Sequence, residues 1–297
     1  MRCSAGSKGP LRGLRSSILV AVAALTASVC GSTLPASAAV PSAASRTAPV
    51  QACQGQSNGP GLPPLKALSG TVPVPDPINL PPTAAVFGAS YPGDAQYLVA
   101  PSGWTCDTVF FSADGGEQAF VHPGASVADP LSAQFSSVVQ AVFNSGGVQT
   151  NVDLACPFVP QATAPATPGG QPGNCTAPPR QSADRVHAVA TGNPGLSVAA
   201  IGVPSGVREP NLPVTTQAPP TGPGSPGNPV VALVVLQGPQ GTAQEVTCSL
   251  PKATATAGCQ ATLGYFLANS PVGQQMSSTD LANAVADLNN FISAFVG

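Results

Sequence analysis

Two histidines are the residues of this chain best suited to acid–base chemistry, because imidazole gains and loses a proton near neutral pH. His122 follows an apolar run and precedes Pro123, and we interpret it as an exposed strand end. His187 follows Asp184 by three residues, so this carboxylate could orient the ring of a general base. His187 and Asp184 are therefore the candidates for a catalytic pair, although a solvent-facing strand explains the same pattern more simply.

Gly55-Gln56-Ser57-Asn58-Gly59 matches the G-x-S-x-G spelling of a hydrolase nucleophile, but it lies in the Pro/Ala/Ser-rich stretch, with no strand-to-helix elbow evident around it. The stretch Gly124-Ala125-Ser126-Val127-Ala128 departs from the pattern, because it ends in alanine. A Ser-His-Asp triad is recognised by its geometry rather than by its order in the chain, so a hydrolase that combines His187 with a distant serine stays open. The chain also lacks the calcium-loop, H-E-x-x-H and phosphate-loop patterns, and we predict neither a metal nor a cofactor.

Aromatic rings that could stack on a sugar lie within one short region, at Tyr91, Tyr97 and Trp104. The chain contains a single tryptophan and three tyrosines, so a carbohydrate platform would have few rings to use. We expect Trp104 to pack in the core beside Cys106 instead.

The first residues predict a secretory signal peptide at residues 1–39. Basic residues precede an apolar stretch from Ile18 to Val29, and Ala36-Ser37-Ala38 supplies small side chains for cleavage after Ala38 or Ala39. The apolar stretch is too short to cross a bilayer, which takes about 20 residues. We therefore expect a secreted protein, extracellular or associated with the cell wall, with no transmembrane segment once the signal is removed.

Six cysteines remain after the signal, and an even number in an exported chain predicts disulfides. The six are Cys53, Cys106, Cys156, Cys175, Cys248 and Cys259. Metal sites commonly use closely spaced pairs such as C-x-x-C, and none occurs here. Many pairings are conceivable. The shortest loops join the third cysteine to the fourth and the fifth to the sixth, which leaves the first to reach the second.

Charge is scarce: 7% of the 297 residues are charged, against about a quarter of a typical globular domain. Six basic and twelve acidic residues remain after the signal, and the basic ones are scattered. No basic stripe can therefore neutralise several phosphates at once, which excludes nucleic acid as a partner.

Proline and glycine divide the chain into segments, with 35 and 32 residues respectively. We interpret residues 40–82, which contain Val72-Pro73-Val74-Pro75-Asp76-Pro77, as a Pro/Ala/Ser-rich linker, because repeated prolines lack backbone donors and favour extended chain. Two Pro/Gly-rich stretches, near 159–181 and 208–229, predict disordered insertions. A disulfide-stabilised domain would then occupy residues 83–297.

Short apolar or alternating runs predict seven strands. They cover residues 96–100, 108–112, 118–122, 185–189, 196–203, 230–236 and 245–250. Asp114-Gly115-Gly116-Glu117 has the composition of a hairpin turn between the second and third of these runs. Residues 151–158 read as a further extended segment.

Two helices are predicted. Residues 129–147 begin with Asp129-Pro130, end in Gly146-Gly147 and place apolar side chains at helical spacing between them. The second helix starts at Ser277-Ser278-Thr279-Asp280, which resembles a capping box, and continues with an apolar stripe. These elements predict a single α+β domain, an antiparallel or mixed sheet packed by two amphipathic helices, with long Pro/Gly-rich disordered loops.

Motifs around the cysteines carry a family resemblance. Ser102-Gly103-Trp104-Thr105-Cys106, Ala155-Cys156-Pro157-Phe158 and Glu245-Val246-Thr247-Cys248-Ser249-Leu250-Pro251 resemble a group of uncharacterised secreted proteins of high-GC actinobacteria. The resemblance covers residues 97–267. It implies a shared disulfide frame and lends no catalytic activity.

The sequence favours a secreted, disulfide-stabilised protein that acts by binding at the cell envelope or outside the cell, with a cell-wall component or an extracellular protein as partner, and without enzymatic activity. One alternative is a secreted hydrolase that uses His187. Another is an extracellular proteinase inhibitor, whose reactive loop would be residues 159–174, between paired cysteines. The oligomeric state is left open by the sequence.

Overall fold

A computed structural model describes residues 46–58, 65–90, 95–111, 115–144, 146–213 and 227–297. Residues 44–297 pack as one compact unit of α+β type. The predicted signal peptide and part of the second predicted insertion lie outside the described residues. No described helix is long and apolar enough to cross a membrane.

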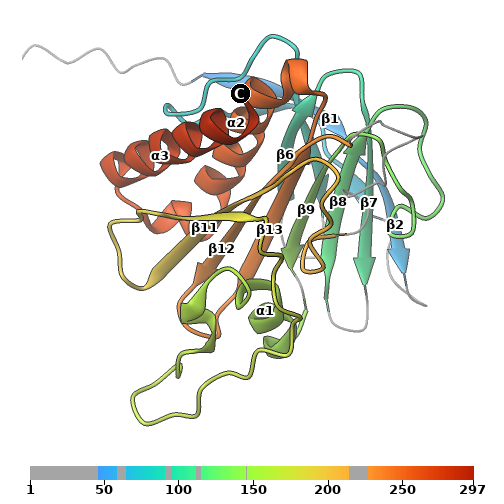
Figure 1. Ribbon diagram of the computed structural model, residues 1–297. Coiled ribbons are helices and arrows are strands. Elements are labelled where there is room, and N and C mark those ends of the chain that lie inside the picture. The colour runs from blue at the N-terminus through green and yellow to red at the C-terminus, as the bar shows by residue number, and fades with distance from the viewer. Residues whose placement is uncertain (1–45, 59–64, 91–94, 112–114, 145, 214–226) are drawn as a thin grey trace, which may run out of the picture. The chain divides into compact units, whose positions relative to one another are not determined.

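An eight-stranded sheet is the largest element of this unit (Figure 1). Its order is β10-β11-β12-β13-β9-β8-β7-β2, antiparallel throughout except between β2 and β7. The strands are β2 (Gln54–Asn58), β7 (Thr105–Phe111), β8 (Glu117–His122), β9 (Val138–Asn144), β10 (Arg185–Val189), β11 (Leu196–Val203), β12 (Val230–Gln237) and β13 (Ala243–Ser249). Six predicted strands and the hairpin are confirmed here. Gly115 supplies the hairpin's positive φ of 74°.

A second, five-stranded sheet is formed by strands from the earlier part of the chain. It contains β1 (Thr47–Ala52), β3 (Lys66–Ala67), β4 (Thr71–Pro73), β5 (Ala84–Ser90) and β6 (Ala95–Pro101). Strand β5 pairs in parallel with β1 and antiparallel with β6. The predicted strand at residues 96–100 is therefore confirmed, as the middle of β6.

The predicted linker at residues 40–82 is not a linker where the structure describes it, because it contributes β1 to β4. Val72, Val74 and Ile78 are buried, while Pro73, which stands between the two valines, is exposed. An extended chain alternates its side chains, so apolar residues at every second position form a packing face even among prolines. Ile78 reaches helix α2 (Lys252–Asn269), where its Cδ1 lies 3.1 Å from the position a Cβ of Gly264 would occupy.

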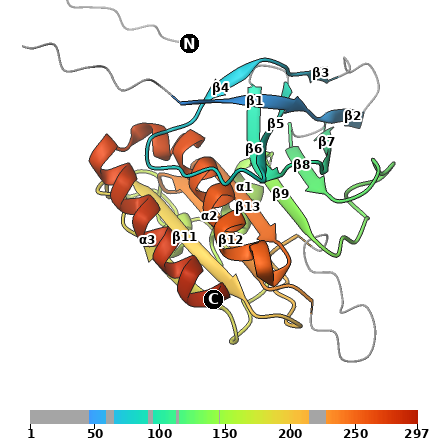
Figure 2. The same cartoon turned by 90° about the horizontal axis from the view of Figure 1, so that it is seen from above.

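Two helices cover one face of the large sheet. Helix α2 packs on β12, β13 and β6, and α3 (Ser278–Val296) packs on α2, β10 and β11 (Figure 2). The predicted cap of α3 is confirmed: Ser277 Oγ accepts a hydrogen bond from the Asp280 backbone N–H at 3.1 Å. The opposite face of the sheet is covered by α1 (Val148–Ala155) and by η1 (Pro160–Thr163).

The helix predicted at residues 129–147 is wrong. Its apolar half is strand β9, which lies between β8 and β13 and is buried along almost its whole length. A short run of branched apolar residues fits both a helix and a buried strand. Here hydrogen bonding to β8 on one side and to β13 on the other stabilises the strand. The glycine pair ends the strand and begins the next helix instead: Gly146 has φ 94°, and Gly147 is the N-cap of α1.

Two further differences concern helices. The extended segment predicted at residues 151–158 is mostly helix α1, which buries Asn151, Val152 and Ala155 on one face. Helix α2 was not predicted. It is buried between the sheet and α3, so its sequence lacks the alternation of apolar and polar faces that marks an amphipathic helix. The structure thus has three α-helices among the described residues, two of them on one face of the sheet.

The three disulfides join the pairs expected from the shortest loops: Cys53–Cys106, Cys156–Cys175 and Cys248–Cys259. The last ties β13 to α2. The segment near residues 159–181, predicted to be disordered, starts with buried Val159 and Ala162. Nearer its end, Thr176 donates to Asp153, and the Gln181 N–H donates to Glu209.

Candidate functional site

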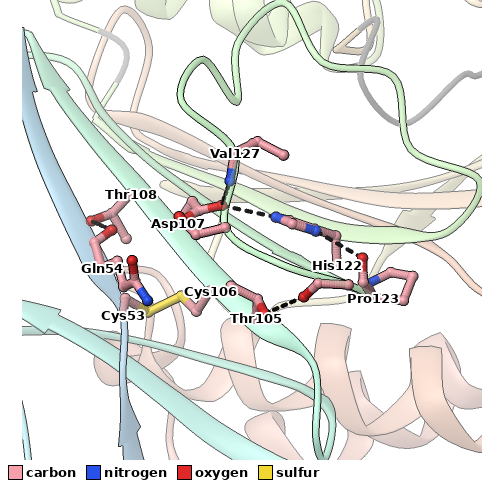
Figure 3. A network of polar contacts seen from close by, with 11 residues as sticks. Cys53, Gln54, Thr105, Cys106, Asp107, Thr108, His122, Pro123 and Val127 are labelled. Atoms are coloured by element: carbon pink, nitrogen blue, oxygen red, sulfur yellow. Dashed lines mark hydrogen bonds and ion pairs between the residues drawn. A yellow bond between two sulfur atoms is a disulfide. The ribbon is translucent and has the colours of Figure 1, made fainter.

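Asp107 and His122 form a buried polar cluster on adjacent strands β7 and β8 (Figure 3). His122 Nε2 lies 2.9 Å from Asp107 Oδ2, and each side chain is 1% exposed. The same Oδ2 accepts the Val127 backbone N–H at 3.0 Å, while Ser126 Oγ donates to Oδ1. Phe135 stacks on the imidazole with ring centroids 4.2 Å apart. The exposed strand end predicted for His122 is thus wrong.

The order of this cluster differs from that of a serine hydrolase. In a triad the histidine stands between the serine and the carboxylate and takes the serine's proton. Here the carboxylate stands between Ser126 and His122, so the imidazole does not receive the hydroxyl proton. The Asp107 carboxylate instead fixes the turn that follows β8, by accepting from a ring, a hydroxyl and a backbone amide.

The carboxylate that contacts His187 belongs to Asp287 and not to Asp184, the residue proposed from the sequence. His187 Nε2 lies 2.9 Å from Oδ2 of Asp287, on helix α3, and the two side chains are 38% and 36% exposed. Phe291 stacks on the ring with centroids 5.5 Å apart. The hydrogen bond between His187 and Asp287 joins β10 to α3 at the edge of the sheet, and the orienting role expected of Asp184 falls to Asp287.

Asp184 pairs with a second acid, Glu209. Burial, together with the hydrogen bond and the charge of Glu209, raises the pKa of Asp184 to about 7. Although burial opposes it, hydrogen bonds from Asp184 and from the backbone of Gln181 and Asn211 hold the pKa of Glu209 below its usual value. Below about pH 7 the pair therefore holds one proton, which resides on Asp184.

Glu245 is a deeply buried acid in the middle of the large sheet. It lies in β13, paired with Val142 of β9 and Val234 of β12, and is 1% exposed. Neither carboxylate oxygen has a hydrogen-bond partner within the described part of the chain. Burial raises the pKa of Glu245 to about 8, so this side chain is a neutral acid at physiological pH.

One grouping of metal-type ligands occurs in the described residues: Asp153 with Cys156 and Cys175. The two sulfur atoms are bonded to each other, so neither is a thiolate that could ligate an ion. The Asp153 carboxylate is occupied by Thr176, whose N–H and Oγ both donate to it at 2.7 Å. This grouping fixes the loop closed by the disulfide.

A groove lies where β6, the Pro-rich segment after β4 and the end of α2 meet. It consists of two neighbouring cavities of about 150 Å³ and 270 Å³, both lined by Tyr97 and Asn269, and we call it the Tyr97 groove. Gln96, Gln244 and Gln274 line the smaller cavity. Pro75, Asp76 and Tyr265 line the larger one.

Trp104, the tryptophan considered from the sequence, does not line this groove. Trp104 is half-buried against the core cluster that includes Cys106, as predicted. Tyr91 lies outside the described residues.

Asp107, Glu245 and Asp287 were not identified from the sequence as members of polar or buried sites. Asp107 and Glu245 are acids in the middle of strand runs that also contain apolar residues, and buried carboxylates require partners or a bound proton. Asp287 gave no signal near His187, because the two lie 100 residues apart. Tyr97 was considered only for its ring, whereas the amides that surround it come from distant segments.

Comparison with protein-family models found no match, and neither did searches of curated proteins and of solved structures.

Proposed function

We propose that this chain is an exported binding protein that acts at the cell envelope or outside the cell and performs no chemistry of its own. Three disulfides support the first part, because such bonds persist in oxidising compartments. An origin among the secreted proteins of high-GC actinobacteria, which the cysteine-centred motifs resemble, is compatible with this role.

The observation that carries the proposal is the Tyr97 groove. Concave sites with a few fixed polar groups and apolar walls are where proteins bind ligands. The groove draws its walls from segments distant in the sequence, and amides are the commonest polar side chains in it, at Gln96, Gln244, Asn269 and Gln274. Amides bind ligands without acid–base chemistry, so the groove is better suited to recognition than to catalysis.

A sedimentation experiment tests the proposed function. Purified protein beginning at residue 40 is incubated with cell-wall material and with the extracellular protein fraction. We expect it to sediment with the wall or to capture an envelope partner, and Tyr97→Ala to reduce the bound fraction. Gln275→Ala is the control, because Gln275 neighbours the groove residue Gln274 but does not line the groove. Failure of the parent protein to associate with either fraction contradicts the proposal.

A hydrolase remains the second candidate, supported by the 2.9 Å contact between His187 and Asp287. A carboxylate that orients a half-exposed imidazole is one part of a general base. A panel of ester, peptide and glycoside substrates, repeated on His187→Ala, tests it. Activity that disappears in the variant would favour the hydrolase, whereas equal activity in both proteins removes this assignment.

A further inference from the structure

Three amide side chains of the Tyr97 groove are each held in place by one hydrogen bond to the backbone. Gln244 Nε2 donates to the Phe143 carbonyl at 2.7 Å, Asn269 Nδ2 to the Tyr265 carbonyl at 2.9 Å, and Gln274 Nε2 to the Asn269 carbonyl at 3.1 Å. Each amide keeps an oxygen acceptor and a second N–H donor for other partners. Fixed side chains lose less conformational freedom when a ligand binds.

The apolar part of the groove is also held rigidly. Tyr97 lies opposite Gly88 in the β5–β6 pair, and a Cβ at Gly88 would lie 3.0 Å from two carbons of its ring. The tyrosine ring therefore packs on the glycine, which fixes its position across the strands. Phe143 and Phe266, with centroids 6.0 Å apart, extend the apolar wall of the smaller cavity.

Charge is nearly absent from the groove. Among the described residues, neither cavity is lined by lysine, arginine or histidine, and Asp76 is the one carboxylate, in the larger cavity. The segment that carries Asp76 is anchored by Arg46, whose guanidinium donates to the carbonyls of Asp76 at 2.8 Å and Ile78 at 2.9 Å. An anionic ligand would therefore find no cation in the walls and would be repelled by Asp76.

We infer that the Tyr97 groove binds an uncharged carbohydrate. A sugar ring carries closely spaced hydroxyl groups, each both donor and acceptor, and these match amides that present both functions. Its C–H face suits the ring of Tyr97, and a carboxylate such as Asp76 accepts hydrogen bonds from hydroxyl groups. The inference rests on the proposed function and specifies the ligand as the glycan part of the envelope.

The test measures binding of the purified protein to immobilised neutral oligosaccharides built from glucose, mannose, galactose, arabinose or N-acetylglucosamine. A proline-rich peptide is included, because amides also recognise peptide groups. We expect saturable binding to at least one oligosaccharide that changes little between low and high salt, because no charge pair contributes. Tyr97→Ala should weaken it by about tenfold or more and Gln274→Ala by about threefold or more.

A matched control separates a direct contact from damage to the fold. Gln275→Ala removes an amide that is also bonded to a backbone carbonyl and neighbours Gln274, but does not line the groove, and it should bind like the parent protein. If Tyr97→Ala unfolds, Gln274→Ala carries the test alone, because its side chain is exposed.

The outcomes distinguish the inference from the proposed function. If the parent protein sediments with cell-wall material but binds no oligosaccharide, or binds only the peptide, the carbohydrate inference is wrong and the proposed function stands. If it binds an oligosaccharide equally well in Tyr97→Ala and Gln274→Ala, the site is elsewhere and the inference is also wrong. If it binds neither sugars nor any envelope fraction, both proposals fail.

Discussion

Cys53 is bonded to Cys106 at the place where the chain passes from one sheet to the other. Cys53 lies between β1 of the five-stranded sheet and β2 of the eight-stranded sheet, and Cys106 belongs to β7, the parallel neighbour of β2. The Cys53 N–H donates to the Gly88 carbonyl of β5 at 3.0 Å. One residue is thus fixed to both sheets, covalently to one and by a hydrogen bond to the other.

Removing this disulfide should cost more stability than removing the shortest one. Cys53–Cys106 spans 53 residues and Cys248–Cys259 spans 11, so the chain-entropy argument predicts a difference of about 1.4 kcal/mol between the two double alanine variants. Urea titration of each variant measures the free energy of unfolding. A larger loss for the 248–259 variant would show that strain or packing, rather than loop length, decides.

Asp107→Asn should destabilise the protein by about 2–4 kcal/mol, because an amide cannot replace both carboxylate oxygens, which bond the buried His122 ring, Ser126 and the Val127 N–H. Ser126→Ala should cost less than about 1 kcal/mol, because Ser126 is exposed and water can replace its hydroxyl. Thermal unfolding compares the two variants. A large effect of Ser126→Ala on any enzymatic activity, with stability unchanged, would contradict a structural role for the cluster.

We predict that the free energy of unfolding decreases as the pH rises, because the buried acids Asp184 and Glu245 have raised pKa values in the folded protein. The folded state raises the pKa of Asp184 from 3.8 to about 7 and that of Glu245 from 4.5 to about 8. Between those limits the folded protein keeps protons that the unfolded chain has released, so the free energy of unfolding decreases with pH, by up to about 1.4 kcal/mol per unit for each group. The contribution is complete below about pH 4 and is lost by about pH 8.

Glu245→Gln isolates one of these protons. The neutral amide has nearly the same shape and does not titrate, so unfolding measured at pH 5 and at pH 8 should differ less in the variant than in the parent protein. The acids with lowered pKa, Asp153 and Glu209, act below this interval and do not mask the effect. A parent protein that is more stable at pH 8 than at pH 5 would contradict the assignment.

Gly202→Ala should destabilise the contact between β11 and α3 by about 1–3 kcal/mol, because the new Cβ would lie 2.7 Å from a ring carbon of Phe295. Replacing that ring in the same variant, by Phe295→Leu, should recover part of the loss. A double-mutant cycle on the free energy of unfolding measures the coupling, and additive effects would show that the two side chains do not compete for space.

The sequence was informative where local pattern and tertiary environment agree. Strands bounded by turn residues could be predicted even where they are buried, as β12 and β13 are, and helix α3 could be predicted from its Ser277 cap and its apolar stripe. Helix α2 could not, because burial of most of its length removes the polar positions that define a helical period. Strand β9 reads as a helix because its apolar side chains also fit helical spacing between residues typical of a helix start and stop.

The candidate site was less accessible to sequence reasoning than the fold. The pairing of His187 with Asp287 and the collection of amides around Tyr97 arise from long-range packing that no local motif records. The disulfides are the exception, because the shortest-loop argument needs only positions along the chain. The Pro-rich segment after β4 shows the opposite error: its composition indicated a linker, whereas its alternation of valine with proline produced a buried face.

The position of Ile78 against Gly264 fixes where a shortened form of this protein can begin. A chain that starts at residue 83, the domain boundary expected from composition, would lack the segment that covers α2 and one wall of the Tyr97 groove. It would also leave Cys106 as an unmatched thiol, which could crosslink two molecules in an oxidising medium. Production of a truncated protein should therefore retain everything from Arg46 onward.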